Sequence, residues 1–539
     1  MDAKKSDCNK RCDKILSNES YDFLRMDPRG LGYILFEKLA EHGKDVMQID
    51  TITGKEDTFV NFRTRCIRTA LHMKSKGYSP QDKITICTYN TLDSAVPLIA
   101  SILTGLVPNT LDPSFSVDDF KYYLQLIKPK AIFVAPEVEH SIKEAAKSNN
   151  LDTEVIVFGT SFNDFLIPVE GEETFVPFLP LSVRDTALVL FSSGTTGKPK
   201  AICLSHVGLY QFATSKTICV KSDRLLFFSS LYWISQVCLT FANIIFGFVK
   251  LVYPKFDTAR TFCNIVRDYK LHTTFLPPST LVEISNYCIQ NGITLQMDNI
   301  FVGGATVSKE HLKLASKVFP SAKFLNCYGQ TEVGFISAFP RKENFTEKHE
   351  EKVFAGSSGN ISPGITLRIV NLDTEETLGP MEEGEIRLRS NTLMNGYYGV
   401  DSSDVYDSQG WFKTGDIGYY DEEEFIYIVG RCKEMLKYKS FPVSPAILED
   451  VLLQHPAIKE CVVTGIPHEV DGDHPVAFVT LKQGFKVNPD EIKEFVDDRV
   501  DDRKRLRGGV ILIDNIPLTA TGKPQRRMLK EMLQSINCQ

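Results

Sequence analysis

The alternation of short apolar runs with helix-like segments restricts the possible folds most strongly. Three runs, Asp82–Cys87, Lys130–Ala135 and Glu154–Phe158, have the length and β-branched content of buried strands. Two segments between them, Leu92–Leu106 and Val138–Ser148, are typical of helices. Because strands that alternate with helices form parallel connections, the sequence predicts an α/β fold with parallel sheets.

The pattern changes near residue 350. Segments 366–370 and 384–389 alternate apolar and polar residues, and acidic turns separate them. This period of two is typical of strands with one solvated face. We therefore expect a smaller antiparallel β subdomain here.

A further compact segment follows Gly430. It has strand-like and helix-like runs of its own, at 444–453, 460–464, 476–480 and 489–502. Its length suits a small autonomous α+β domain. The predicted organisation is a large N-terminal domain over residues 1–430 and a small C-terminal domain over residues 431–539.

Composition excludes several classes of protein. The net charge of −7 and the pI near 5.9 argue against nucleic acid or an anionic membrane as the main partner. Thirteen cysteines without a paired framework predict free thiols in a reducing compartment. The N-terminus has no apolar signal region and the C-terminus lacks Ser-Lys-Leu, so we expect an intracellular, cytoplasmic protein. Polar residues interrupt the apolar segment Leu225–Val252, which favours a strand and a buried helix over a transmembrane span.

The strand-like run Thr186–Phe191 leads into a loop suited to a polyphosphate. The loop, Phe191–Lys200, combines glycines that admit a close backbone approach with hydroxyl and ammonium donors. It differs from a P-loop, because two residues separate its glycines and Pro199 follows Lys198. The alternative is a polar surface turn.

Four further motifs carry candidate chemistry. Asn326–Gly334 holds an aromatic ring, a hydroxyl and a carboxylate, although Thr and Glu are also typical of a capped helix start. Asp416 lies in Gly410–Gly418, where we expect a glycine-flanked turn that either binds a ribose or forms an Asx turn. Gly430–Lys439 is a basic run that could equally be a solvated surface. Lys523 lies in a loop bounded by Gly and Pro.

Taken in order, these motifs resemble the signature set of the adenylate-forming superfamily, which includes acyl-CoA synthetases, 4-coumarate:CoA ligases and insect luciferases. The resemblance runs from about residue 30 to 530. It implies an AMP-binding (adenylation) domain over 1–430 and a mobile C-terminal domain over 431–539. It also implies that ATP and CoA are reactants, that Mg²⁺ is the cofactor, and that the substrate is a small-molecule carboxylic acid.

The resemblance also implies roles for individual residues. The loop residues should hold the β- and γ-phosphates: Ser193, Gly194, Thr195, Thr196, Gly197 and Lys198. A second group should surround the adenine: Gly303, Gly304, Ala305, Tyr328 and Gly329. A third should act on the α-phosphate, the Mg²⁺ and the ribose: Thr331, Glu332, and the pair Asp416 and Arg431. Lys523 should act in adenylation, Lys433 should be the hinge, and Lys437 should serve the second step.

The resemblance places an acyl pocket around six residues: Tyr232, Trp233, Gln236, Cys327, Gly334 and Phe335. Its apolar and aromatic character favours a medium or long fatty acid or an aromatic acid over acetate. Trp233 replaces a histidine found in many relatives and cannot carry a proton. Ser440 and Pro442 replace the family's Gly and Gln, which affects the CoA side of the reaction.

Two alternatives remain beside an acyl-CoA ligase. One is an insect luciferase, which would oxidise a luciferyl-adenylate with O₂. The insect-like sequence Lys437–Lys439 favours it, and the segment Tyr232–Gln236 departs from the beetle pattern. The other is a non-catalytic acyl- or nucleotide-binding homologue, which the presence of Glu332, Asp416 and Lys523 disfavours. The sequence makes no prediction about oligomeric state.

Overall fold

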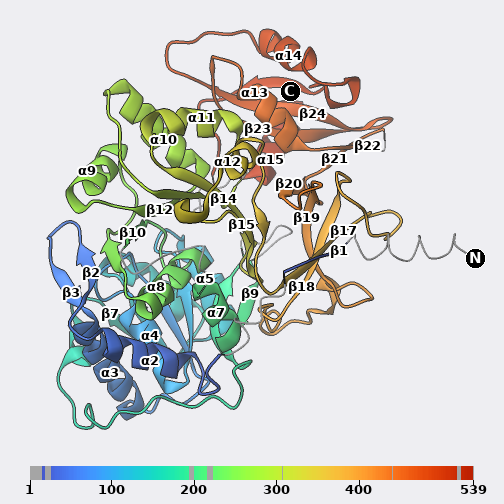
Figure 1. Cartoon of the computed structure of the whole chain (residues 1–539). Coiled ribbons are helices and arrows are strands. Elements are labelled where there is room, and N and C mark those ends of the chain that lie inside the picture. Colours follow the sequence, from blue (N-terminus) through green and yellow to red (C-terminus); the bar gives the residue numbers. More distant parts are fainter. Residues whose placement is uncertain are drawn as a thin grey trace, which may run out of the picture.

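Four β-sheets organise the chain (Figure 1). The computed structural model describes residues 15–18, 26–192, 199–214, 223–305, 307–439, 441–518 and 524–537. Two of the sheets are mainly parallel and belong to the large N-terminal part, a third is antiparallel, and the fourth belongs to the C-terminal domain. The mixed α/β fold with a separate small C-terminal domain confirms the predicted fold class.

The first sheet has six strands in the order β7-β6-β4-β5-β8-β9. Its strands are β4 (Lys83–Cys87), β5 (Val107–Leu111), β6 (Ala131–Val134), β7 (Glu154–Val157), β8 (Thr186–Phe191) and β9 (Ala201–Ser205). All neighbouring pairs are parallel except β8 with β9. The strand predictions for this region are therefore confirmed.

The second sheet has nine strands in the order β16-β15-β14-β13-β12-β10-β11-β2-β3. Its strands are β2 (Val46–Asp50), β3 (Glu56–Thr58), β10 (Arg224–Phe227), β11 (Val249–Val252), β12 (Thr273–Leu276), β13 (Asn299–Val302), β14 (Lys323–Gln330), β15 (Gly334–Ala338) and β16 (Asn360–Ile361). The six strands from β14 to β2 are parallel.

Helices connect and cover these sheets. They are α2 (Leu31–His42), α3 (Phe59–Ser75), α4 (Val96–Thr104), α5 (Val117–Ile127), α6 (Glu139–Ser148), α7 (His206–Ala213), α8 (Ile234–Phe246), α9 (Ala259–Tyr269), α10 (Pro278–Gln290), α11 (Lys309–Val318) and α12 (Glu347–Phe354). Short 3₁₀ turns occupy Pro136–Val138, Ser161–Leu166, Lys342–Asn344, Ser403–Val405 and Asp502–Lys504. Leu225–Val252 forms a strand and the buried helix α8, as predicted, followed by a second strand that the sequence does not predict. Among the described residues, no helix combines the length and apolar character that crossing a membrane requires.

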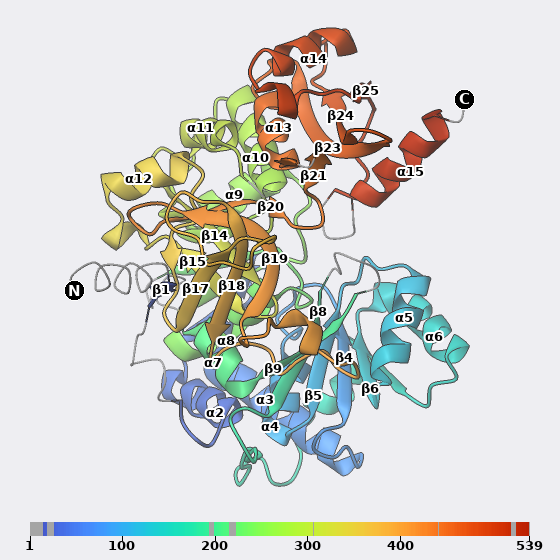
Figure 2. The same cartoon turned by 90° about the vertical axis from the view of Figure 1, so that its right-hand side faces the viewer.

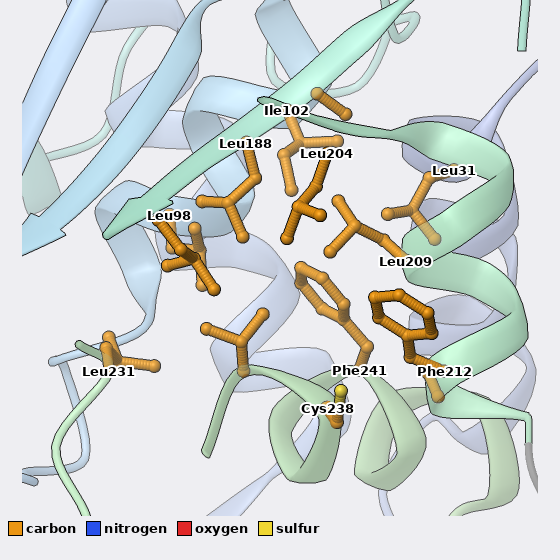
Figure 3. Close-up of a cluster of buried hydrophobic side chains, with 14 of the residues drawn as sticks. Leu31, Leu98, Ile102, Leu188, Leu204, Leu209, Phe212, Leu231, Cys238 and Phe241 are labelled. Carbon is orange, nitrogen blue, oxygen red and sulfur yellow. The ribbon is translucent and has the colours of Figure 1, made fainter. Parts of the chain in front are cut away.

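A hydrophobic core joins the six-stranded sheet to helices α7 and α8 (Figure 3). Leu188 and Leu204 extend from β8 and β9 toward Phe212 of α7 and Phe241 of α8. Ser205 begins α7, because its hydroxyl accepts a hydrogen bond from the Gly208 amide at 3.1 Å. The same helix places Phe212 against Gly334 of β15.

The antiparallel sheet has the order β1-β17-β18-β19-β20. Its strands are β1 (Ile15–Ser17), β17 (Ile365–Val370), β18 (Gly384–Ser390), β19 (Phe412–Tyr420) and β20 (Ile426–Arg431). Every neighbouring pair is antiparallel, which confirms the predicted β subdomain.

The C-terminal domain lies above the other sheets in Figure 2. It contains β21 (Leu436–Tyr438), β22 (Phe441–Val443), β23 (Ile458–His468), β24 (Gly472–Leu481) and β25 (Gly509–Leu512), with α13 (Pro445–Leu452), α14 (Pro489–Asp497) and α15 (Arg526–Asn537). A core of its own, which includes Leu448, Val463 and Ala477, holds it together.

Two predicted helices are too long. The helix predicted over Leu92–Leu106 begins only at Val96, because Thr91 and Ser94 hydrogen-bond to each other locally and hold a turn. The helix predicted to end at residue 502 ends at Asp497. Beyond that helix, the Asp501 carboxylate accepts a hydrogen bond from the Arg503 amide, and a separate 3₁₀ turn begins at Asp502.

Candidate functional site

The carboxyl ends of parallel strands from both large sheets lead into the predicted site. Strands β10 and β13 of the nine-stranded sheet end at the same edge and are followed by the Trp233 loop and Gly303–Ala305, and the parallel strand β14 carries Tyr328 near its own carboxyl end. In the six-stranded sheet, β8 ends at Phe191 before the predicted phosphate loop. The carboxyl edge of an open α/β sheet is where ligands characteristically bind.

The loop after β10 connects the two sheets. Asn90 donates its side-chain amide to the Ser229 carbonyl at 3.0 Å. Ser230 donates its hydroxyl to Asp112 Oδ2 at 2.7 Å, and Thr110 donates to the Leu231 carbonyl at 2.8 Å. Thr110 lies in β5 and Asp112 directly follows it, so these bonds tie the loop after β10 to the six-stranded sheet.

Aromatic rings continue from this loop toward the end of β8. Tyr232 packs edge-on against Trp233, at a centroid distance of 5.5 Å, and against Phe115 at 5.1 Å. Phe115 stacks on Tyr123, which contacts Phe191 at 4.6 Å. The predicted pocket residues Tyr232 and Trp233 therefore belong to one aromatic cluster.

The other predicted pocket residues lie on neighbouring elements. Gln236 is buried in α8, where its amide donates to Asn90 Oδ1 at 3.1 Å and its Oε1 has no partner. Cys327 lies in β14, and its thiol approaches the Val302 carbonyl at 3.6 Å. Phe335 lies in β15 and packs against the main core.

The motif Asn326–Gly334 forms a β-hairpin, so the helix-start alternative is wrong. Strand β14 runs to Gln330, and β15 returns antiparallel from Gly334. Gly334 has a φ of 88°, and a Cβ there would lie 2.3 Å from the Phe212 ring. The hairpin thus requires glycine at this position, and it presents Thr331 and Glu332 at its tip.

Asp416 lies within strand β19, which corrects the prediction of a glycine-flanked turn. Cross-strand pairing with Arg431 of β20 holds this segment extended. Asp416 Oδ2 accepts from the Tyr328 hydroxyl and from the Gln330 amide, each at 2.6 Å. Asp416 Oδ1 pairs with Arg431 Nε at 2.6 Å. Three predicted residues, Tyr328, Asp416 and Arg431, are thereby brought together.

Burial dominates the electrostatics of this cluster. Asp416 is 3% exposed, and its desolvation raises the pKa of the carboxyl above the ordinary value, although Arg431, Tyr328 and Gln330 oppose the rise. Burial and the neighbouring Asp416 also raise the pKa of Tyr328 far above its usual range. Tyr328 therefore remains a hydroxyl donor at neutral pH.

Glu332 is a second carboxyl group at the site, and it is half-buried. Its Oε1 accepts from the Tyr397 hydroxyl at 3.2 Å, and its carbonyl accepts from the Met394 amide at 2.8 Å. Lys200 lies over the Tyr397 ring, with its Nζ 4.5 Å from the ring centroid. Burial raises the pKa of Glu332, and the Tyr397 hydrogen bond opposes that rise.

The remaining predicted residues lie around this centre or outside the described part. Gly304 and Ala305 are exposed beyond β13. Lys433 is exposed in the turn after β20, and Lys437 is exposed on β21. The phosphate loop from Ser193 to Lys198, Ser440 and Lys523 lie outside the described residues.

The structure adds two residues that the sequence did not indicate. Gln330 binds both Asp416 and the Thr414 carbonyl, and Tyr397 binds Glu332. Gln330 lies inside the motif Asn326–Gly334, so its position in the sequence could have indicated a role at the site. Tyr397 lies in a Gly-Tyr-Tyr-Gly run with no chemical indication of its partner.

Comparison with known proteins agrees with this geometry. The profile of the AMP-binding enzyme family matches residues 35–398, and that of the AMP-binding enzyme C-terminal domain matches residues 448–523. The chain is 30% identical over 507 residues to luciferin 4-monooxygenase from Photuris pensylvanica, covering 89% of this chain and 91% of the relative. It is 28% identical to 4-coumarate:CoA ligase 1 from Petunia hybrida, covering 92% and 93% of the two chains.

Solved structures have the same fold. The luciferase-like enzyme from the nonluminescent Zophobas morio mealworm is 32% identical, with a TM-score of 0.72 over 78% of this chain and 99% of that one. ATP-bound MatB from Rhodopseudomonas palustris is 21% identical, with a TM-score of 0.84 over 95% and 100% of the two chains. The predicted resemblance is confirmed: this chain is an enzyme of the AMP-binding family, within the adenylate-forming superfamily.

Proposed function

We propose that this enzyme activates a hydrophobic carboxylic acid with ATP and transfers the acyl group to the thiol of CoA. In the first step, a carboxylate oxygen attacks the α-phosphorus, and the bond to pyrophosphate breaks to give an acyl-adenylate. In the second step, the thiol sulfur attacks the acyl carbon, AMP leaves, and the thiol proton is released. The buried Asp416 cluster beside Glu332 is the observation that carries this proposal.

Asp416 and Arg431 are assigned to the ribose. Tyr328, Gln330 and Arg431 donate to the Asp416 carboxylate, which offers about four lone-pair directions in total. One direction is therefore left for a ribose hydroxyl. Tyr328 and Gly329, with Gly303–Ala305 at the end of the adjacent strand, are assigned to the adenine.

Glu332 is assigned to Mg²⁺. Proteins commonly hold this cation through one or two carboxylates together with substrate phosphates, so a single half-buried glutamate at the hairpin tip fits. The cation supplies charge that stabilises the phosphates during transfer. Tyr397 positions the glutamate, Thr331 is assigned to the α-phosphate, and loop residues Ser193–Lys198 are assigned to the β- and γ-phosphates.

The aromatic cluster favours a hydrophobic acid. Tyr232 and Trp233 are held rigidly by the loop that joins the two sheets, and neither ring provides a charged group for a polar substrate. Gln236, Cys327, Gly334 and Phe335 complete the proposed pocket. The unpartnered Gln236 Oε1 gives this apolar wall one acceptor.

Lysines of the C-terminal part are assigned to the two steps. Lys523 stabilises the departing pyrophosphate during adenylation. Rotation of the C-terminal domain about Lys433 then brings Lys437 to the thiol side for the second step.

A second candidate function is light emission. The similarity to luciferin 4-monooxygenases favours it, and in that case O₂ would oxidise a luciferyl-adenylate in place of thiol attack. Both functions share the adenylation step, so the assignments around Asp416 and Glu332 serve either one.

Pyrophosphate release tests the proposal. The purified chain is supplied with MgATP and a panel of fatty, cinnamic and short acids and luciferin, with and without CoA, while light is recorded. Acid-dependent release followed by thioester formation in darkness supports the ligase. Light with luciferin and no thioester supports the second candidate, and no release with any acid contradicts both.

A further inference from the structure

Three side chains converge at the turn between β23 and β24 of the C-terminal domain. His474 Nε2 lies 2.9 Å from Asp471 Oδ2, and His468 Nδ1 lies 3.6 Å from the same oxygen. The two imidazole rings stack with centroids 4.0 Å apart. Within the described ranges, these residues form the one group of His, Cys, Asp and Glu side chains close enough to hold a metal ion together.

Strand register brings the histidines together. His474 pairs with Ile466 across the hairpin, and His468 follows Ile466 by two residues. Because side chains two apart share one face of a strand, the histidines are diagonal neighbours on that face. The turn then returns Asp471 between them. The arrangement is therefore a product of the hairpin itself.

The donor set suits a cation of the zinc class. Two imidazole nitrogens and one carboxylate oxygen are ligands that Zn²⁺ takes in sites with an open fourth position. Metal–ligand bonds of about 2.0–2.1 Å in tetrahedral geometry place neighbouring ligand atoms about 3.3 Å apart. The observed separations of 2.9 and 3.6 Å lie on either side of that value. A hard cation such as Mg²⁺ would prefer oxygen ligands.

A cation would replace the His474 Nε2–Asp471 Oδ2 hydrogen bond at 2.9 Å and two longer bonds to His468. His468 Nδ1 accepts from the amides of Val470 and Asp471 at 3.4 and 3.1 Å. Val470 is 84% exposed, so water can take over these bonds. Lys439 lies 3.7 Å from Asp471 Oδ1, which leaves Oδ2 facing the histidines.

The same turn is bonded to the strand that carries Lys437. The Lys439 amide donates to the Asp471 carbonyl at 2.6 Å, and the Lys437 amide donates to Asp473 Oδ2 at 2.9 Å. Gly472, with a φ of 88°, packs so closely that a Cβ would lie 2.3 Å from the Lys437 carbonyl. A cation that fixes the turn therefore also fixes β21.

We propose that His468, Asp471 and His474 bind a divalent cation of the zinc class, and that its binding stiffens β21. This site is separate from the Mg²⁺ assigned to Glu332. It requires neither the proposed acyl transfer nor any role of Lys437 in that reaction.

Metal titration of the full chain tests the site. Wild type, His468→Gln and His474→Gln are freed of metal with a chelator and titrated with Zn²⁺, and with Co²⁺ as a spectroscopic probe. His140→Gln, a change of an exposed histidine on α6, is the matched control. Wild type and control should bind one more equivalent than either site variant. Their extra Co²⁺ should give tetrahedral bands without thiolate charge transfer, which separates the site from the thirteen cysteines.

Amide hydrogen exchange tests the consequence for β21. Zn²⁺ should slow exchange over residues 436–438 and 468–474 in wild type and in the control, and leave both site variants unchanged. Equal Zn²⁺ stoichiometry and affinity in all four proteins would overturn the site. An extra equivalent in wild type without slower exchange over 436–438 would overturn the stiffening.

Discussion

Asp416 is a buried carboxyl group that its neighbours orient by hydrogen bonds and an ion pair. Asp416→Asn removes the charge that pairs with Arg431, while the cross-strand position and size of the side chain remain. A hydrogen bond to a charged group contributes about 1.5–3 kcal/mol, so we expect ATP to bind about 10- to 100-fold more weakly. Calorimetric titration with MgATP measures this change.

A matched control is available at the end of the same strand. Asp421 is also buried and pairs with Lys352 at 2.6 Å, away from Tyr328 and Gln330. Asp421→Asn should lower the melting temperature and leave ATP affinity unchanged. An Asp416→Asn protein that binds ATP as tightly as this control would remove the ribose assignment.

Tyr397 positions Glu332 without being assigned to any reactant. Tyr397→Phe removes the hydroxyl that donates to the glutamate and keeps the ring beneath Lys200. We expect the Mg²⁺ concentration for half-maximal adenylation to rise about tenfold, since the lost bond involves a charged acceptor. Tyr398→Phe, one residue along the chain, is the control and should match wild type.

The pH dependence of adenylation provides an independent measurement of the same bond. Burial raises the pKa of Glu332, so this carboxylate accepts a proton at a higher pH than an ordinary glutamate and activity is lost as pH falls through that value. The Tyr397 bond favours the charged form and lowers the pKa. Tyr397→Phe should therefore move the acid limb of the rate profile to higher pH; a shift to lower pH would contradict the positioning role.

The sequence could name Tyr328, Glu332 and Asp416 because each lies in a motif with recognisable chemistry. The hydrogen-bond partners of these residues could not be predicted in the same way. Gln330 and Asp416 are separated by 86 positions, and Tyr397 and Glu332 by 65. Such pairs depend on how two sheets meet, and local composition carries no information about that.

At the scale of elements, the β14–β15 hairpin depends on Gly334. Gly334→Ala places a methyl group 2.3 Å from the Phe212 ring in a backbone conformation that favours glycine. We expect the free energy of unfolding to fall by about 2–4 kcal/mol, from strain and overpacking together. Gly356, with a φ of 91° and open space around it, separates the two causes. Gly356→Ala should lower the free energy of unfolding only by the backbone strain, about 1 kcal/mol. Urea denaturation measures both variants. Equal losses of stability in the two variants would show that the Phe212 contact is unimportant.

Strand positions were more predictable than helix ends or turns. Apolar runs such as Thr186–Phe191 identify buried strands, because side chains on both faces are covered. The start of α4 was mispredicted, since hydrogen bonds between Thr91 and Ser94 compete with the helix. The glycines that flank Asp416 predict a turn, whereas pairing with β20 holds it in a strand.

At the scale of the whole molecule, alternating strands and helices predict the α/β class, and the compact segment after Gly430, with strand-like and helix-like runs of its own, predicts the separate C-terminal domain. The order of strands in each sheet was not predictable, because β2 and β3 join the edge of a sheet whose other strands lie far along the chain. The loop after β10 likewise binds residues at the end of β5 in the other sheet. The candidate site therefore lies where two sheets meet whose strands come from different parts of the chain.

The proposed rotation of the C-terminal domain predicts that its lysines act in different steps. Lys523→Ala should slow pyrophosphate release about 100- to 1,000-fold, as expected when a preorganised cation is lost from a transition state. It should leave thioester formation from supplied acyl-adenylate close to wild type.

Lys437→Ala should do the reverse, because its side chain lies exposed on β21 and is assigned only to the thiol side. Lys482→Ala, an exposed lysine of the same domain that donates to the Pro456 carbonyl, is the control and should affect neither step. Single-turnover measurements of each half-reaction distinguish the variants. If both lysine variants slow the same half-reaction, the domain does not present two surfaces in turn, and both lysines belong to one closed arrangement of the site.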